Sequence, residues 1–257
     1  MTAATPAPPG LPPFPGGVSL SHLRVYDWPA PQGAGRSGSG TPHLHTASSE
    51  AYVVLAGAGS VQTLGPAGFA ETALALGAVM WFTPGVVHRL VNDGGLEILV
   101  IMSNAGLPEA GDAVLTFPTE VLADVGCYRE AATLPTPQRR RSTAGGDDAV
   151  VAAAARVRRD LALEGFAALR ARVDCEGPGG LDDLYAAAGR LVADRVPRWQ
   201  EIWTAGVPGQ TAATARALAD LAQGKAPHLA QAGVGAASLR PGPSGYGMCG
   251  RLQTWAL

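Results

Sequence analysis

The chain is poor in cysteine, and its cysteines lie far apart. Its 257 residues include three, Cys127, Cys175 and Cys249, and none of these belongs to a CxxC pair. A disulfide framework or a zinc ribbon requires cysteines at short, regular spacings. The sequence therefore argues against both, and we expect three small buried thiols.

Long hydrophobic runs are absent as well. No apolar stretch approaches the roughly 18 residues that a membrane-spanning helix requires. Residues 1–17 contain six prolines and no basic segment, which differs from a secretion signal. We interpret residues 1–17 as a disordered, proline-rich N-terminus, and we expect a cytoplasmic protein with no membrane partner.

Positive charge is scarce in the first half of the chain. Residues 1–131 contain 4 Lys or Arg against 10 Asp or Glu, a balance of −6, and the remainder contains 15 against 11, a balance of +4. Solvated helix faces explain so modest an asymmetry more simply than a nucleic-acid site does. No nucleic-acid partner is therefore expected.

Short apolar runs separated by glycine and proline fill the region 18–133. They cover residues 18–28, 43–46, 51–56, 60–64, 69–74, 78–83, 88–92 and 96–102. Strands of 4 to 8 residues at such regular spacing predict an antiparallel sandwich or barrel. We therefore assign residues 18–133 to one β domain.

The pattern changes after this domain. Residues 134–148 combine proline, the basic triplet Arg139, Arg140 and Arg141, and paired glycines, and they predict a linker with a solvated basic loop. Asp147 or Asp148 is expected to cap a first helix, which ends at glycines 177–180. Its apolar face is predicted to contain Val150, Ala154, Val157, Leu161, Phe166, Leu169 and Val173.

Residues 149–257 are predicted to form an α-helical region. The clearest amphipathic pattern covers residues 181–203, where Pro197 should kink or split the helix, and a third helix is expected over 210–223. Trp199 and Trp203 lie on the apolar stripe and are expected in a core or an interface. Residues 248–255 form a candidate strand returning to the sheet.

Three histidines and a glutamate form the strongest chemical signal. His43 and His45 share one face of a strand, because residues two apart point the same way. Glu50 follows closely enough to reach the neighbouring strand, and His88 comes from a distant one. Three neutral imidazoles and a carboxylate suit one divalent transition metal, Fe, Mn, Ni, Co or Zn.

These residues stand in a register that resembles the cupin superfamily. The first cupin motif is matched by His43, His45, Glu50 and Gly57, and the second by Gly77, Gly85, His88 and Asn92. Two positions depart from the pattern: Ser37 stands where a leading glycine is expected, and the proline has moved one place to Pro84. The resemblance implies an α+β chain, with a cupin-type antiparallel β-barrel (jelly roll) followed by the α-helical region.

Strand parity predicts which side chains line the barrel cavity. Tyr52 shares a face with Glu50, Asn92 shares a face with His88, and one of Trp81 and Phe82 should reach the interior. The residues expected to bind substrate are Tyr52, Trp81, Asn92, Ile98 and Met102.

The scarcity of positive charge also bears on the substrate. Residues 1–131 have no lysine, and their arginines are Arg24, Arg36, Arg89 and Arg129. A sugar-phosphate isomerase of the cupin type would need cationic groups to hold the phosphate. The predicted cavity better suits a small, largely apolar or carboxylated organic molecule.

We therefore interpret the chain as a metal-dependent cupin enzyme, most simply an oxygenase (a dioxygenase, hence an oxidoreductase), in which Glu50 and Tyr52 are the candidate catalytic residues. A non-catalytic small-molecule-binding or sensory cupin stays open. So does an isomerase or epimerase, with Arg156, Arg158 or Arg159 supplying positive charge. A helix-turn-helix regulator is disfavoured, because no compact helix pair with a short turn is evident. A homodimer is expected.

Overall fold

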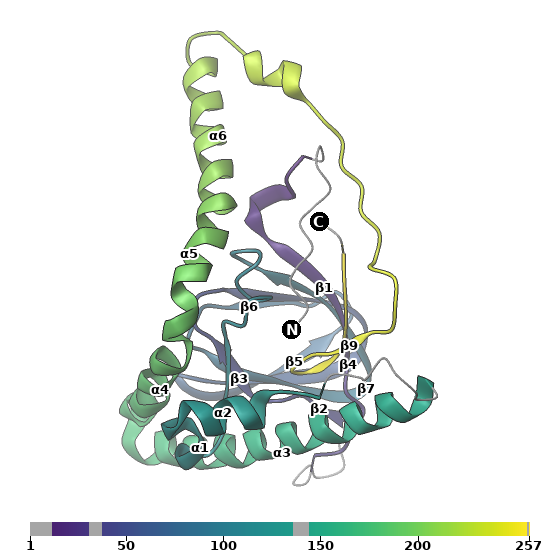
Figure 1. Ribbon diagram of the computed structural model, residues 1–257, viewed down its shortest axis with the longest axis vertical. Helices are drawn as coiled ribbons and strands as arrows, with labels where there is room; N and C mark the ends of the chain where they lie inside the picture. The colour runs from purple at the N-terminus through teal and green to yellow at the C-terminus, as the bar shows by residue number, and fades with distance from the viewer. Residues whose placement is uncertain (1–11, 31–37, 136–143, 256) are drawn as a thin grey trace.

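The computed structural model describes residues 12–30, 38–135, 144–255 and 257. Residues 1–11 of the predicted disordered N-terminus, position 37 of the motif and the basic triplet at 139–141 lie outside these ranges. An antiparallel sheet is followed by a long helical region (Figure 1). The predicted α+β class is therefore confirmed.

The described residues contain a ten-stranded sheet. Its strands are β1 (Ser19–Val25), β2 (Gly38–Ser39), β3 (His43–His45), β4 (Glu50–Gly65), β5 (Gly68–Ala75), β6 (Val79–Phe82), β7 (Val87–Met102), β8 (Ala113–Leu115), β9 (Gly245–Tyr246) and β10 (Gly250–Thr254). The main order is β5-β4-β7-β1-β10-β9, with β2 and β3 on β7, β6 on β4, and β8 on β3.

Strands β4 and β7 each replace two of the predicted short strands. They pair with each other along their length, while β4 also pairs with β6 near its start and with β5 near its end. The glycines expected to form turns instead form an irregular, bulged stretch, with register shifts between Val54 and Gly59. Gly57 adopts φ +71° there, so a bulge bends the strand where the sequence suggested a break.

The six α-helices of the described residues follow the sheet in sequence, apart from the last two strands. They are α1 (Thr119–Ala123), α2 (Val125–Ala132), α3 (Ala144–Glu176), α4 (Asp182–Val192), α5 (Val196–Ala205) and α6 (Val207–Leu221), with short 3-10 turns at Pro15–Gly17, Gly177–Leu181, Ala193–Arg195 and Pro227–Gln231. The expected break at Pro197 is confirmed, because α4 and α5 are separate helices. The predicted cap is wrong, because α3 begins at Ala144 and includes positions 147 and 148.

The predicted apolar face of α3 is also partly wrong. Val150 and Val157 are 60% and 69% exposed, whereas Val151 and Ala155 are buried. Alanine occupies so many positions that few large side chains define the phase of the helix. The buried face also contains Arg158 and Arg159, which a search for apolar periodicity counts as solvent-facing.

Two apolar clusters stabilise the chain. One fills the barrel with side chains such as Leu23, Val54 and Ile98. The other joins the strands to the helices and includes Leu44 and Trp199. In Figure 1, α3 runs below the barrel while α4 and α5 rise along one side. The helices therefore complete a core with the sheet.

The predictions about the burial of the tryptophans and of the cysteines have different outcomes. The buried position of Trp199 agrees with the expectation, and Trp203 is 45% exposed. The prediction of buried thiols holds for Cys249 but is wrong for Cys127 and Cys175, which are exposed. Both lie on helices, where a solvent-facing position accommodates a small side chain.

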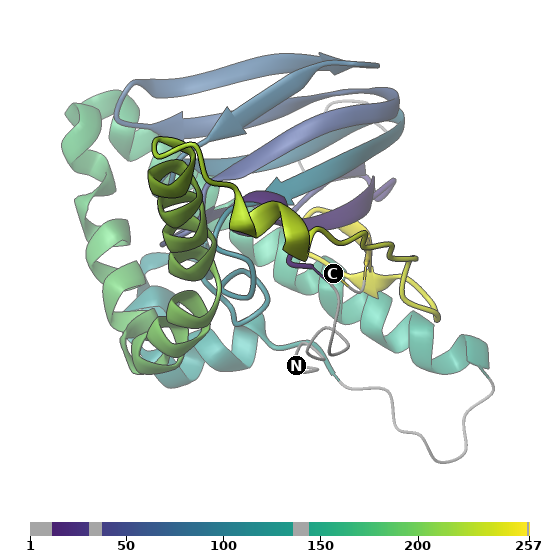
Figure 2. The same ribbon diagram turned by 90° about the horizontal axis from the view of Figure 1, so that it is seen from above.

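The C-terminal segment returns to the sheet, as predicted. Strand β10 pairs antiparallel with β1, with Ser21 opposite Thr254 and Val25 opposite Gly250. Figure 2 shows the β9–β10 hairpin lying beside α3 at the edge of the barrel. There Asp148 accepts hydrogen bonds from Tyr246 Oη and Arg251 Nη1, at 3.1 and 3.0 Å.

None of the helices in the described ranges is both long enough and apolar enough to cross a membrane.

Candidate metal centre

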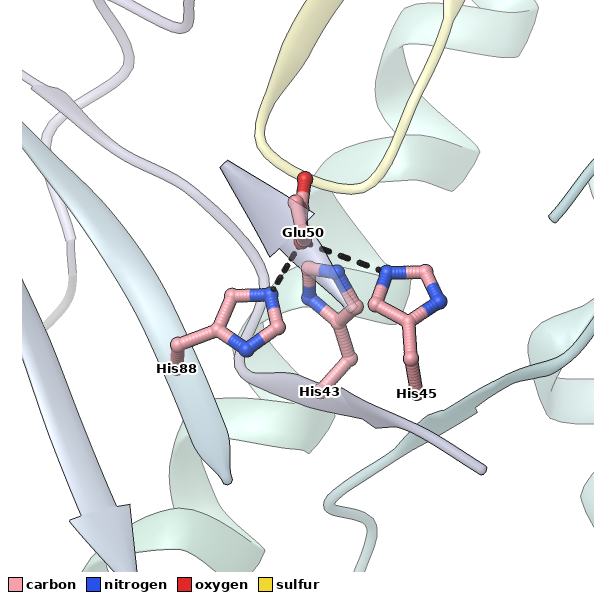
Figure 3. Close-up of side chains that lie close together, drawn as sticks. All are labelled: His43, His45, Glu50 and His88. Carbon is pink, nitrogen blue, oxygen red and sulfur yellow. Dashed lines mark ion pairs between the residues drawn. The ribbon is translucent and has the colours of Figure 1, made fainter. Parts of the chain in front are cut away.

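The four residues predicted as metal ligands lie together (Figure 3). His43 and His45 come from β3, Glu50 begins β4, and His88 lies on β7 directly opposite His43. One nitrogen or oxygen atom from each side chain falls within 4.8 Å of the others, and all four residues are buried. The sheet register thus brings three segments to one point.

The outer nitrogen of each imidazole is already engaged. His43 Nδ1 lies 2.8 Å from the carbonyl oxygen of Thr41, and His88 Nδ1 lies 3.0 Å from that of Val86. His45 Nδ1 lies 2.6 Å from Oδ1 of Asp112. Since carbonyls and carboxylates only accept, each Nδ1 carries a proton, and Nε2 is the nitrogen of each ring that can bind a metal ion.

Two side-chain atoms at the centre of the cluster lack the hydrogen-bond partners that buried polar atoms normally have. Glu50 Oε2 lies 2.9 Å from His88 Nε2 and 3.3 Å from His45 Nε2. Yet neither Glu50 Oε2 nor His88 Nε2 has a hydrogen-bond partner among the described residues. Because unpaired buried polar atoms are costly, this arrangement fits a shared cation, and the mixture of nitrogen and oxygen donors fits a divalent transition metal.

The electrostatics of the cluster agree with a site for a cation. Burial, together with the neighbouring His88 and His45, lowers the pKa of His43 well below its usual range. Burial raises the pKa of Glu50, but His88 and His45 outweigh it, so the net pKa is well below normal. Glu50 is therefore ionised, and the His43 imidazole is neutral, as metal ligands must be.

His45 is held between two carboxylates. Burial lowers its pKa, but hydrogen bonding and charge from Asp112 and Glu50 outweigh burial and raise the pKa to about 10. A divalent cation at Nε2 would compete with the proton that this environment favours. Asp112 thus increases the basicity of the nitrogen through which His45 would bind a metal ion.

Asp112 is a residue that the sequence did not reveal. It is fully buried, and besides contacting His45 it accepts a hydrogen bond from the backbone N–H of Ser48 through Oδ2, at 3.0 Å. It lies between β7 and β8, 67 residues from His45. Nothing in the sequence distinguishes it from the other acids of this half.

A cavity of about 230 Å³ adjoins the ligand cluster. Tyr52 and Met102 line it, in agreement with the predicted lining, together with Leu23 and Val100. Other parts of the lining come from later in the chain. They include Arg158 of α3, one of the three arginines that an isomerase was expected to use, and C-terminal residues such as Tyr246, Cys249 and Leu252.

Three residues expected to bind substrate lie elsewhere. Trp81 is 71% exposed, because it pairs with Ala51 on the outer face, whereas Phe82 pairs with Glu50 and is buried. Phe82 is therefore the inward aromatic, with its ring centroid 4.1 Å from that of His88.

Asn92 and Ile98 have structural roles. Asn92 donates to the carbonyl oxygen of Val25 at 3.1 Å and accepts from the N–H groups of Gly94 and Leu96. Its amide is thus committed to the bend of β7. Ile98 is fully buried in the barrel core. Neither lines the cavity beside the ligand cluster.

Comparison with known proteins agrees with the β domain. The family described as "Cupin domain" matches residues 33–102. None of the curated proteins matches the chain. The likeness to solved structures is distant.

An uncharacterized protein from Klebsiella pneumoniae with a double-stranded beta-helix domain is 19% identical, with 33% of this chain and 62% of that one covered, at a TM-score of 0.23. A cupin protein from Bacteroides fragilis is 21% identical, with 33% and 60% covered, at 0.23. The capsular polysaccharide assembling protein CapF from Staphylococcus aureus is 18% identical, with 34% and 22% covered, at 0.25. The chain spans less than two thirds of the length of each.

The family match covers the strands that carry all four clustered side chains. The antiparallel sheet and the His/Glu cluster agree with that match. This chain therefore contains a cupin domain.

Proposed function

We propose that the protein is a metal-dependent cupin enzyme, and that it acts as an oxygenase on a small carboxylated or largely apolar organic molecule. One observation carries the proposal. Three imidazoles with protonated Nδ1 atoms and one ionised carboxylate converge beside a mostly apolar cavity. Such a set leaves an ion accessible to a small substrate.

His43, His45, Glu50 and His88 would hold the ion. When bound, a divalent transition metal supplies Lewis acidity and, if it is redox-active, one-electron chemistry. The ligand types do not select among Fe, Mn, Ni, Co and Zn. The protein's own part is to fix the ligands and to shape the cavity.

Tyr52 is the candidate proton donor of the cavity. Burial, and then the charge of Glu50, raise the pKa of Tyr52 well above its usual range, so the phenol keeps its proton. It can therefore donate a hydrogen bond to a substrate oxygen. Glu50 is the other candidate, because a carboxylate that leaves the metal can accept a proton. The apolar side chains of Leu23, Val100 and Met102 would exclude water from the bound molecule.

Oxygen uptake tests this proposal. Protein loaded anaerobically with Fe(II) or Mn(II) is mixed with a panel of small carboxylic acids, and oxygen is followed with an electrode and products by mass spectrometry under ¹⁸O₂. We expect substrate-dependent uptake with label in the product, and its loss in H88A. Metal-loaded protein that binds a panel member but consumes no oxygen would contradict the oxygenase proposal.

An isomerase or epimerase is a second candidate, and the position of Arg158 favours it. Positive charge does reach the cavity from the helical region, so the scarcity of arginine in the barrel weighs less against an anionic substrate. Conversion without oxygen uptake is the result this candidate predicts.

A sensory role is favoured by α6. None of the 15 residues of this helix is buried, so a partner protein could bind it. Tight ligand binding without turnover is the result expected of a sensor.

The expected homodimer would bury an exposed apolar surface. Leu55, Val79 and Trp81 lie on the outer face of β4 and β6 and are 44%, 58% and 71% exposed. Light scattering coupled to size exclusion tests this, and a mass of one chain would contradict it.

A further inference from the structure

The cavity beside His43, His45, Glu50 and His88 is lined by a positively charged residue, and this residue comes from the helical region and not from the barrel. Arg158 belongs to α3, more than a hundred residues after His43 and His45, yet it lines the same cavity as both. It is only 7% exposed. Figure 2 shows α3 running beside the C-terminal hairpin, and Tyr246, Cys249 and Leu252 of that hairpin line the same cavity. Arg158 is thus part of the cavity lining.

The hydrogen bonds of Arg158 leave its charge uncompensated. Nη2 donates to the carbonyl oxygen of Gly247 at 2.9 Å, and Nη1 donates to that of Ala132 at 3.3 Å. Nε has no hydrogen-bond partner in the part of the chain that the structure describes. Within the same ranges, no carboxylate forms an ion pair with Arg158.

The next residue along α3, Arg159, has a carboxylate partner. Arg159 is also buried, with 2% of its surface exposed, but it pairs with Asp160 at 2.7 Å and donates to the carbonyl oxygens of Trp28 and Pro29. A buried charge without a counterion is costly. Arg158 therefore differs from a structural arginine in lacking the partner that such a charge requires.

We propose that Arg158 binds the carboxylate of the substrate. The other end of the substrate would then face His43, His45, Glu50 and His88. This inference rests on the proposed function and names its substrate class, a small monocarboxylic acid with an apolar body. The guanidinium offers donors in a planar fork that matches a carboxylate.

The rest of the cavity agrees with such a ligand. Leu23, Val100, Met102 and Leu252 provide apolar walls, and Ser19, Ser21 and Thr254 add neutral hydroxyls. The only described carboxylates that line the cavity are Glu50 and the exposed Glu109. Glu109 already accepts from the N–H of Gly106 at 2.8 Å.

The size and charge of the cavity disfavour larger anions. Its volume of about 230 Å³ lies below the roughly 300–1,000 Å³ of pockets that hold drug-sized ligands. One arginine also offers fewer donors than a phosphoryl group with three charged oxygens would use. A short carboxylic acid fits both limits.

A matched pair of probes tests the proposal. The binding of 3-methylbutanoate and of its neutral amide, 3-methylbutanamide, is measured by calorimetry on Mn(II)-loaded and metal-free protein. We expect the wild type to prefer the acid in both forms. We expect R158Q to bind the acid about tenfold more weakly or worse, with binding of the amide little changed.

R156Q is the control, because Arg156 lies on the same helix but is exposed and stacks over Trp28, with its guanidinium carbon 4.6 Å from the ring centroid. We expect R156Q to bind the acid as the wild type does. Unchanged acid binding in R158Q, or a wild type that binds acid and amide equally, would overturn the proposal.

Two further measurements distinguish a failure of the proposal from a failure of folding or of metal loading. If R158Q fails to fold, R158K keeps the charge without the fork, and the acid preference of the wild type still decides. The metal-free arm separates the two proposals. Acid binding that depends on Arg158 in a protein that takes up no metal would support this inference while the proposed function failed.

Discussion

Asp112 fixes His45 from behind, at 2.6 Å, while a backbone N–H holds its other oxygen. We expect D112N to weaken divalent-metal binding by about 10- to 100-fold, because the neutral amide supports the imidazole less and lowers its basicity. A competition titration with a coloured chelator measures the change.

E120Q is the matched control for this experiment, because Glu120 is an exposed acid on α1. It should bind metal as the wild type does. Equal affinities of D112N and the wild type would mean that Asp112 does not position His45.

The His/Glu cluster was predictable from the sequence, because each of its four residues lies in a short motif whose spacing resembles that of the cupins. His43 and His45 need only strand parity, and His88 needs only its place on a second strand. Parity alone did not decide between Trp81 and Phe82. That choice depends on the β4–β6 register, which pairs Phe82 with Glu50.

Gly57 lies in the bulge of strand β4. It adopts φ +71°, and an added Cβ would lie 2.2 Å from the carbonyl carbon and oxygen of Gly95. We expect G57A to reduce the free energy of unfolding by about 3 kcal/mol, from backbone strain and overpacking together.

Gly68 provides the control, because it has φ +88° but nothing within 4 Å of an added Cβ. G68A should therefore lose only the part of the free energy of unfolding that comes from backbone strain, about 1 kcal/mol. Denaturant unfolding of both variants measures the difference. Equal losses would show that the close approach to Gly95 does not constrain β4.

Helix α3 shows where sequence patterns stop being informative. Its length was anticipated, but its buried face was not, because alanines define no clear stripe and two arginines lie inward. Backbone carbonyls of distant segments accept hydrogen bonds from both arginines. Such partners are set by tertiary packing, which apolar periodicity does not record.

At the scale of the whole molecule, α6 stands apart from the rest. It rises beyond the barrel in Figure 1, and none of its residues is buried, whereas α4 buries five. Isolated helices of this length are marginal in water. We expect the amides of α6 to exchange with deuterium on the order of 100-fold faster than those of α4.

Hydrogen exchange with mass spectrometry tests this expectation at low protein concentration, where a weak dimer dissociates. Equal protection of α6 and α4 would contradict it. Protection that appears only as the concentration rises would point to α6 as a contact between copies of the chain.

The cavity is lined by segments from both halves of the chain, and this explains why its lining was predicted only in part. Its barrel wall follows from strand parity at Tyr52 and Met102. Its other wall depends on where α3 and the C-terminal hairpin dock. A composition count of the barrel alone therefore gave a cavity without positive charge, while Arg158 enters it from the helical region.

The proposed metal centre depends on the four converging side chains. The direct measurement is metal content by mass spectrometry after Mn(II) or Fe(II) reconstitution and removal of free ion, for the wild type, H43A, H45A, E50A and H88A. We expect about one ion per wild-type chain and clear losses in all four variants. A folded wild type with far less than one ion per chain, or four variants that keep full occupancy, would contradict it.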